Sequence, residues 1–241
     1  MPVTAEPGRP HREPEENPEH GRLSVRRGTA IVPGRAGTPG SGTTAGDPGA
    51  GDPGAAVFVP EPAGRDAYRL VVLLHGAGGS AGQGLGLMLP VAEQYGLILL
   101  APQSVAATWD MISSGYGPDV RRLDRALAEV LASYPVADMF IGGFSDGASY
   151  ALSLGMTNGD IFDGIVAFSP GFAAPMVSHG SPRIFVSHGD ADRVLPIDRC
   201  SRRLVPRLSA LGYRVTYDEF RGGHEVPDRI VVRAAGWLGE R

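Results

Sequence analysis

Lysine is absent from this sequence of 241 residues, in which all 22 basic residues are arginine. This absence excludes a lysine Schiff base and a phosphate-binding loop built on lysine. The single cysteine, Cys200, excludes an internal disulfide framework and a cysteine-rich zinc site. No apolar run approaches the roughly 20 residues that a membrane-spanning helix needs. Because the net charge is −4 and no basic stripe is visible, we expect no nucleic-acid partner and no stable membrane insertion.

The N-terminal part is rich in proline and glycine and poor in residues that could be buried. Residues 1–20 alternate proline with charge, which predicts a disordered tail. They contain no apolar stretch behind a basic start, so they do not form a secretory signal, and we expect a cytoplasmic protein. Residues 21–56 are predicted to form an edge strand plus a Pro/Gly-rich linker. The candidate strand, Leu23 to Val32, would pair antiparallel with Val57–Pro60.

From residue 57 onward, short continuous apolar runs alternate with segments of helical period. Such runs suit strands that are covered on both faces, as in a parallel sheet. They span residues 56–60, 69–76, 96–103, 138–143, 164–170, 183–189 and 213–220. Helices are predicted over 118–133, 197–211 and 228–238, and Pro206 should kink or split the second. The order predicts an α/β domain over 57–241, with a mostly parallel, doubly wound sheet and helices on both faces.

A Gly-x-Ser-x-Gly sequence, GFSDG at 143–147, follows the fourth apolar run directly and opens an apolar helix. In this context small residues permit a sharp strand–turn–helix that exposes the serine hydroxyl at the head of a helix. Residues 78–82, GGSAG, also match the pattern. Ser80, however, stands beyond loop glycines, and more glycines interrupt the segment after it. Ser145 is therefore the predicted nucleophile, and a tight packing turn without chemistry is the alternative.

A nucleophilic serine needs a general base, and histidine is the usual one. In doubly wound hydrolases the serine comes first along the chain, then the acid, then the histidine, which leaves His179, His188 and His224. His224 is predicted because it lies on a glycine-rich loop after the last strand. Asp192 is the predicted acid, which would hold the imidazole in the correct tautomer. Asp190, two residues earlier, is the alternative, or it holds the turn by binding backbone N–H groups.

Acyl transfer also needs two N–H donors aimed at the tetrahedral oxygen. The predicted donors are the amides of Asp146, after the nucleophile, and Ala77, in the glycine-rich loop after the second apolar run, with Gly78 as the alternative. His75 is expected to pack and fix that loop rather than to catalyse. Candidate pocket residues lie on loops near strand ends, and plain core packing is the alternative for each. They are Trp109, Met111, Phe144, Phe172 and Met176.

Four segments, in this order, resemble the phospholipase/carboxylesterase group of α/β-hydrolases, which also contains small bacterial serine esterases and acyl-protein thioesterases. They are HGAGGS at 75–80, GFSDGAS at 143–149, HGDADRVLP at 188–196 and GGHEVP at 222–227. The resemblance covers about residues 57–238. Two departures stand out. Asp146 occupies a position where many members carry glutamine, although only its amide is needed, and the 1–56 extension is not a family feature.

The resemblance implies a serine carboxylic-ester hydrolase, similar to carboxylesterases and lysophospholipases, that acts through an acyl-enzyme on small or accessible acyl esters. It assigns the triad to Ser145, Asp192 and His224, and the oxyanion positions to the amides of Ala77 and Asp146. It further implies an α/β-hydrolase catalytic domain without a large cap, no metal or organic cofactor, and a monomer or homodimer. The alternatives are an acyl-thioesterase with the same triad, an acyltransferase, and a non-catalytic binding protein on the same fold.

Overall fold

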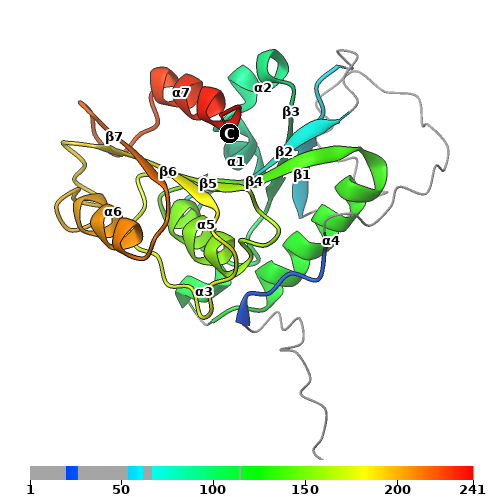
Figure 1. Cartoon of the computed structure of the whole chain (residues 1–241), viewed down its shortest axis with the longest axis horizontal. Helices are drawn as coiled ribbons and strands as arrows, with labels where there is room; N and C mark the ends of the chain where they lie inside the picture. The colour runs from blue at the N-terminus through cyan, green and yellow to red at the C-terminus, as the bar shows by residue number, and fades with distance from the viewer. Residues whose placement is uncertain (1–19, 27–53, 62–66, 114, 241) are drawn as a thin grey trace, which may run out of the picture.

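The computed structural model describes residues 20–26, 54–61, 67–113 and 115–240. These residues form a seven-stranded sheet with helices on both faces (Figure 1). The strands are β1 (Ala55–Phe58), β2 (Tyr68–Leu74), β3 (Leu97–Pro102), β4 (Val136–Phe144), β5 (Gly164–Phe168), β6 (Arg183–Gly189) and β7 (Val215–Phe220). The helices are α1 (Ala81–Gly86), α2 (Leu89–Tyr95), α3 (Asp110–Ser113), α4 (Pro118–Ser133), α5 (Asp146–Thr157), α6 (Ser201–Ala210) and α7 (Asp228–Leu238).

The strand order is β1-β3-β2-β4-β5-β6-β7, and every neighbouring pair is parallel except β1 with β3. Each strand falls on one of the predicted apolar runs, so the doubly wound α/β prediction is confirmed. Strands β3 and β5 are buried at every position, because their side chains pack into a core on each face of the sheet. One core includes residues of α4, α5 and α6, and the other includes residues of α1, α2 and α7.

Helix α6 runs through Pro206, so the predicted split does not occur. The missing N–H of Pro206 removes one bond within the helix. Leu204 and Leu208, on either side of it, are both buried against the sheet. Packing of an amphipathic face contributes more to a helix in a protein than the propensity of one residue does. The predicted helices 118–133 and 228–238 agree with α4 and α7.

The predicted strand over residues 23–32 is wrong in its described part, because residues 22–26 form no strand and β1 pairs with β3 instead. Side chains hold this N-terminal segment (residues 20–26) in place of a ladder. The Leu23 amide donates to Asn158 Oδ1 at 3.0 Å, and Asn158 Nδ2 donates to the Gly21 carbonyl at 2.7 Å. The Val25 amide donates to Asp124 Oδ1 at 3.1 Å. Residues 27–32, the tail before residue 20 and the linker up to residue 53 lie outside the described residues.

We expect Asn158→Ala to loosen the N-terminal segment. Asn158 is fully buried, and its loss leaves the Leu23 N–H and the Gly21 carbonyl without their partner, at about 1–3 kcal/mol for each buried group. Cleavage by trypsin after Arg22 should become faster, and the thermal midpoint should fall. Asp160→Ala, which removes an ion pair to Arg22 at 2.8 Å, is the control and should have a smaller effect. Equal cleavage rates in wild type and Asn158→Ala would contradict this account.

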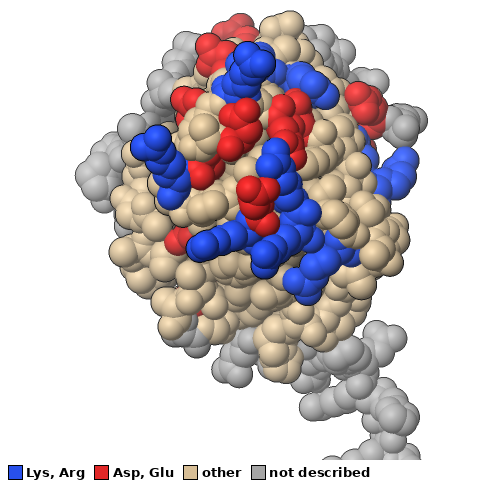
Figure 2. All heavy atoms as spheres, turned by 90° about the vertical axis from the view of Figure 1, so that its left-hand side faces the viewer, with Lys and Arg blue, Asp and Glu red and all other residues tan. Residues whose placement is uncertain are grey.

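The face at the β7 end of the sheet carries positive and negative side chains interspersed (Figure 2). Arg202 of α6 lies 2.6 Å from Glu219 of β7 and 2.8 Å from Asp198. Arg233 of α7 lies 3.1 Å from Asp218 of β7. Charges on this face are therefore paired rather than gathered by sign. Separately, within the described ranges no helix has both the length and the apolar character needed to cross a membrane.

Candidate active site

Ser145 occupies the sharp turn between β4 and α5. Its backbone has φ 57° and ψ −120°, in a region that residues other than glycine rarely adopt. The Ser145 N–H donates to the carbonyl oxygen of Phe168 at 3.0 Å, which ties the turn to the end of the neighbouring strand β5. The sheet thus holds a strained serine at the carboxyl edge of its central strands, at the start of a helix.

The two glycines of the Gly-x-Ser-x-Gly sequence are required by close backbone approach. A Cβ atom on Gly143 would lie 2.6 Å from the carbonyl oxygen of Leu74. A Cβ atom on Gly147 would overlap the carbonyl oxygens of Leu74 and His75. Only glycine lets α5 and β4 meet β2 at this distance. The same pattern around Ser80 instead caps α1, where the Ser80 side chain accepts the Gln83 amide.

The three residues predicted as a triad are brought together by the loops after β4, β6 and β7. His224 Nε2 lies 2.9 Å from Ser145 Oγ, and His224 Nδ1 lies 2.7 Å from Asp192 Oδ2. The serine hydroxyl can donate to Nε2 while Nδ1–H donates to the carboxylate. This tautomer is the one that lets a histidine accept a proton from serine. Ser145 is 9% exposed, so it lies largely within the protein.

Asp192 is a buried carboxylate with fixed partners. Its Oδ1 accepts the amides of Val194 and Leu195, each at 2.8 Å. Burial alone would raise the pKa of Asp192, but the bonds from His224 and from these amides outweigh burial and hold the pKa below its ordinary value. The carboxylate therefore stays charged at neutral pH, where it can stabilise an imidazolium at His224.

The alternatives weighed for acid and base take other positions. Asp190 is exposed, and its Oδ1 accepts the amide of Gly222 at 3.2 Å, so it holds the turn that leads to His224. His179 lies in the loop before β6, where its backbone N–H donates to Met156. His188 is buried beside Asp192 without reaching Ser145 in any described contact.

The two predicted oxyanion donors differ in their bonding from Gly78, the alternative donor. The Gly78 N–H donates to the carbonyl of Ala107 at 2.5 Å, so the alternative donor is already occupied. The amides of Ala77 and Asp146 have no acceptor among the described residues. The Asp146 amide also belongs to the first turn of α5, where the helix dipole favours negative charge. Thr108 donates its hydroxyl to Asp146 Oδ2 at 2.7 Å, which fixes that side chain.

His75 fixes the loop that carries Ala77, as predicted. It is 1% exposed. Its Nε2 accepts the amide of Ser104 at 3.1 Å, so Nδ1 carries the proton and donates to the Gly76 carbonyl at 2.7 Å. Because the peptide unit is planar and trans, fixing the Gly76 carbonyl also fixes the direction of the Ala77 N–H. Gly76 lies beside the nucleophile, since a Cβ atom there would be 3.4 Å from Ser145 Cβ.

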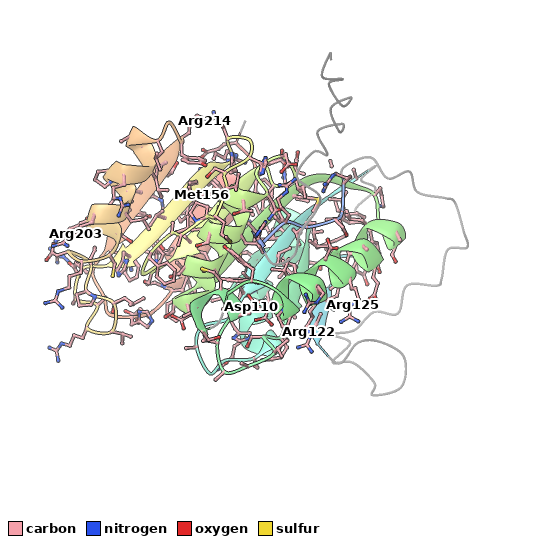
Figure 3. The ribbon with its side chains drawn as sticks, turned by 90° about the horizontal axis from the view of Figure 1, so that it is seen from below. Asp110, Arg122, Arg125, Met156, Arg203 and Arg214 are labelled. Atoms are coloured by element: carbon pink, nitrogen blue, oxygen red, sulfur yellow. The ribbon has the colours of Figure 1, made fainter. Side chains whose placement is uncertain are left out.

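Two buried carboxylates clasp the loop between β3 and α4 (Asp110 is labelled in Figure 3). Asp110 Oδ2 accepts the amides of Gly117 and Asp119, each at 2.8 Å. Asp119 in return accepts the amides of Val105 at 2.7 Å and Asp110 at 2.8 Å. Burial raises the pKa of Asp119. The clasp holds Thr108 and Ala107 against the site, a role that the sequence pattern does not reveal.

Trp109 is a core residue, which corrects its prediction as a pocket wall. Its side chain is 1% exposed and stacks on Tyr150, with ring centroids 5.1 Å apart. Its Nε1–H donates to the carbonyl of His75 at 2.9 Å, so it supports the loop of Ala77 from below. Met111 is half-buried against the same core. The hydrogen bonds of the Asp110–Asp119 clasp fix this loop, so that the indole points into the core. The sequence pattern does not reveal these bonds.

Apolar side chains, several of them exposed, lie in loops at the carboxyl edge of the sheet, the edge that also carries Ser145. The Phe144 ring lies 4.6 Å from the His224 ring. Phe172 and Met176, in the loop after β5, are exposed. Further exposed apolar side chains follow β3, β5 and β6, all at the carboxyl edge of the sheet. The apolar rim consists of Val105, Phe172, Met176, Val177 and Val194.

Comparisons with known proteins agree with this architecture. The family model Phospholipase/Carboxylesterase matches residues 124–238. The structure of esterase PE8 is 24% identical with a TM-score of 0.63, over 77% of this chain and 97% of its own. A fluorophosphonate-binding serine hydrolase of Staphylococcus aureus, FphF, is 16% identical with a TM-score of 0.62, over 78% and 92%. A phospholipase/carboxylesterase from Dyadobacter fermentans is 21% identical with a TM-score of 0.58, over 76% and 96%. No curated protein matches the sequence significantly.

The sheet order, the strained serine turn and the likeness to solved structures define the α/β-hydrolase fold. The match to the phospholipase/carboxylesterase model supports an esterase-type hydrolase. The matched segment contains all three predicted triad residues. The phospholipase/carboxylesterase model matches the part of the chain that contains three of the four sequence segments resembling that family, those at 143–149, 188–196 and 222–227.

Proposed function

We propose that this enzyme hydrolyses carboxylic esters through an acyl-enzyme formed on Ser145. His224 takes the hydroxyl proton as Ser145 Oγ attacks the ester carbonyl, and it then protonates the departing alcohol. In the second half, His224 takes a proton from the water that attacks the acyl-enzyme, and it returns this proton to Ser145 Oγ as the acid leaves. Asp192 keeps His224 oriented and stabilises the imidazolium. The observation that carries the proposal is the continuous hydrogen-bonded chain from Asp192 through His224 to Ser145.

In this proposal the amides of Ala77 and Asp146 bind the oxygen of the tetrahedral intermediate. Each such donor contributes about 3 kcal/mol to lowering the barrier. The proposal is supported by the occupied amide of Gly78 and by the bond that His75 makes to the Gly76 carbonyl. A backbone donor that is already oriented needs no reorganisation when charge develops on the substrate.

The proposed substrates are small or accessible acyl esters, bound within the catalytic domain over residues 57–241. The absence of a large cap over the described carboxyl edge supports this choice, because nothing there would enclose a long chain. The apolar rim would contact the acyl or alcohol group, with Phe144 close to the reacting atoms. An acyl-thioester would use the same relay.

A panel of p-nitrophenyl esters, from acetate to palmitate, tests the proposal together with labelling by a fluorophosphonate. We expect kcat/KM to be highest for the short esters, because the far end of a long acyl chain would extend into water and add little binding free energy. Mass spectrometry should find the phosphonyl group on Ser145. Matched acyl-thioesters on the same scale decide between ester and thioester preference. The proposal is refuted if the folded protein neither hydrolyses these esters nor reacts with the fluorophosphonate.

A further inference from the structure

A second histidine contacts the carboxylate that orients His224. His188 is the next-to-last residue of β6, and its side chain is fully buried. Its Nε2 lies 2.8 Å from the carbonyl oxygen of Leu195 and 3.3 Å from Asp192 Oδ2. Its Nδ1 lies 2.7 Å from the hydroxyl of Ser201. Asp192 Oδ2 therefore lies between two imidazoles, one from β6 and one from the loop after β7.

The partners of His188 determine its tautomer. The Leu195 carbonyl can only accept, so Nε2 carries the hydrogen and donates it. Nδ1 is then the acceptor for the hydroxyl of Ser201, the first residue of α6, which is itself fully buried. Asp192 Oδ2 lies 3.3 Å from the same nitrogen, within reach of electrostatic attraction to the Nε2–H. The ring is thus held by two segments at once, and it cannot turn without breaking bonds to both.

We propose that His188 is a positioning residue, which fixes the Asp192 carboxylate and thereby keeps the His224 ring aligned on Ser145. The inference rests on the proposed function, because it concerns the same relay. Two amides hold Asp192 Oδ1, but rotation of the carboxylate would still carry Oδ2 out of line with His224 Nδ1. A donor that approaches Oδ2 from another side opposes that rotation. It also gives a buried charged oxygen a second partner, which lowers the cost of burying it.

Burial favours a neutral His188 ring over the effect of the acceptors around it. Burial lowers the pKa of His188, and the nearby His224 acts in the same direction, while Asp192 opposes both. Glu219 is the residue opposite His188 in the β6–β7 register. On the α6 side stands Cys200, whose pKa is raised by burial, so it too is neutral. A neutral His188 donates to Asp192 without placing there a positive charge that would compete with the His224 imidazolium.

The test compares His188→Leu with His188→Gln in the full-length protein. Leucine removes both ring nitrogens, whereas glutamine can place an N–H near the position of Nε2. With p-nitrophenyl acetate, we expect His188→Leu to lower kcat by about 10- to 100-fold with KM nearly unchanged, as is typical when the partner of a catalytic group is lost. His188→Gln should recover most of that loss. The far-downfield proton resonance of His224 Nδ1–H, which reports its bond to Asp192, should weaken or shift in His188→Leu and return in His188→Gln.

Thr157→Val is the matched control, since it removes a buried hydroxyl at the far end of α5 that donates to Ser153. It should lower the thermal midpoint without changing kcat or the His224 resonance. The inference is overturned if His188→Leu keeps kcat and the His224 resonance at wild-type values. It is also overturned if Thr157→Val, at the same loss of stability, changes kcat and the resonance as much as His188→Leu does. If His188→Leu does not fold, Ser201→Ala replaces it, and an unmoved resonance there would overturn the inference. Failure of the wild type to hydrolyse esters or bind a fluorophosphonate would count against the proposed function instead.

Discussion

Ser145→Ala should lower kcat on p-nitrophenyl acetate by about 10³-fold or more, approaching 10⁶-fold if the relay acts as one unit. The change removes the Oγ atom that lies 2.9 Å from His224 Nε2, and with it the proposed attacking atom. Alanine fits the same backbone angles about as well as serine, so the thermal midpoint should change little. Initial rates, the midpoint and fluorophosphonate labelling are measured side by side, and labelling should disappear.

Ser80 offers a matched control, because it belongs to the second Gly-x-Ser-x-Gly sequence. It caps α1: its Oγ accepts the Gln83 amide at 3.3 Å, and the Gln83 side chain accepts the Ser80 amide at 2.9 Å. Ser80→Ala should lose about 1 kcal/mol of stability and keep its kcat. Wild-type rates in Ser145→Ala would rule Ser145 out as the nucleophile. If only Ser80→Ala loses activity, Ser80 is the nucleophile.

The strands of this fold were predictable because an apolar run that does not alternate must be covered on both faces. Helix α1 was not predicted, because three of its six residues are glycine, which disfavours a helix. The structure gives the reason for one of them. A Cβ atom on Gly84 would lie 2.7 Å from the carbonyl oxygen of Leu73, so the helix packs closely onto β2. The signal that could have revealed it is the spacing of Ser80 and Gln83, which is that of a capping box.

Ser145 and His224 could be predicted because their motifs and their order along the chain are read directly from the sequence. The choice between Asp192 and Asp190 does not, because both stand in the same loop, and only the backbone path decides which carboxylate meets the histidine. The roles of Trp109 and His188 depend on contacts between distant loops. A tryptophan near a strand end is equally compatible with a pocket and a core. Here the clasp of Asp110 with distant amides turns it inward.

Asp192→Asn should lower kcat by about 10⁴-fold while leaving KM and the fold nearly unchanged, because it imposes the wrong tautomer on the histidine. The amides of Val194 and Leu195 both donate to Oδ1, so the oxygen of an asparagine must take that position. Its NH₂ group then faces His224 Nδ1, which must accept. Nε2 consequently carries the hydrogen and cannot take the proton of Ser145. Kinetics on p-nitrophenyl acetate and the thermal midpoint measure the two effects separately.

Asp190→Asn is the neighbouring control, and it should keep wild-type kcat because an asparagine oxygen can still accept the Gly222 amide. Asp192→Ala is a less informative variant. It leaves the Val194 and Leu195 amides without an acceptor, at about 1–3 kcal/mol for each buried group, so lost activity would be mixed with lost stability. If Asp192→Asn stays within tenfold of wild type while Asp190→Asn loses activity, the acid is Asp190. The loop after β6 would then have to adopt another conformation during catalysis, because Asp190 contacts the Gly222 amide and not the imidazole of His224.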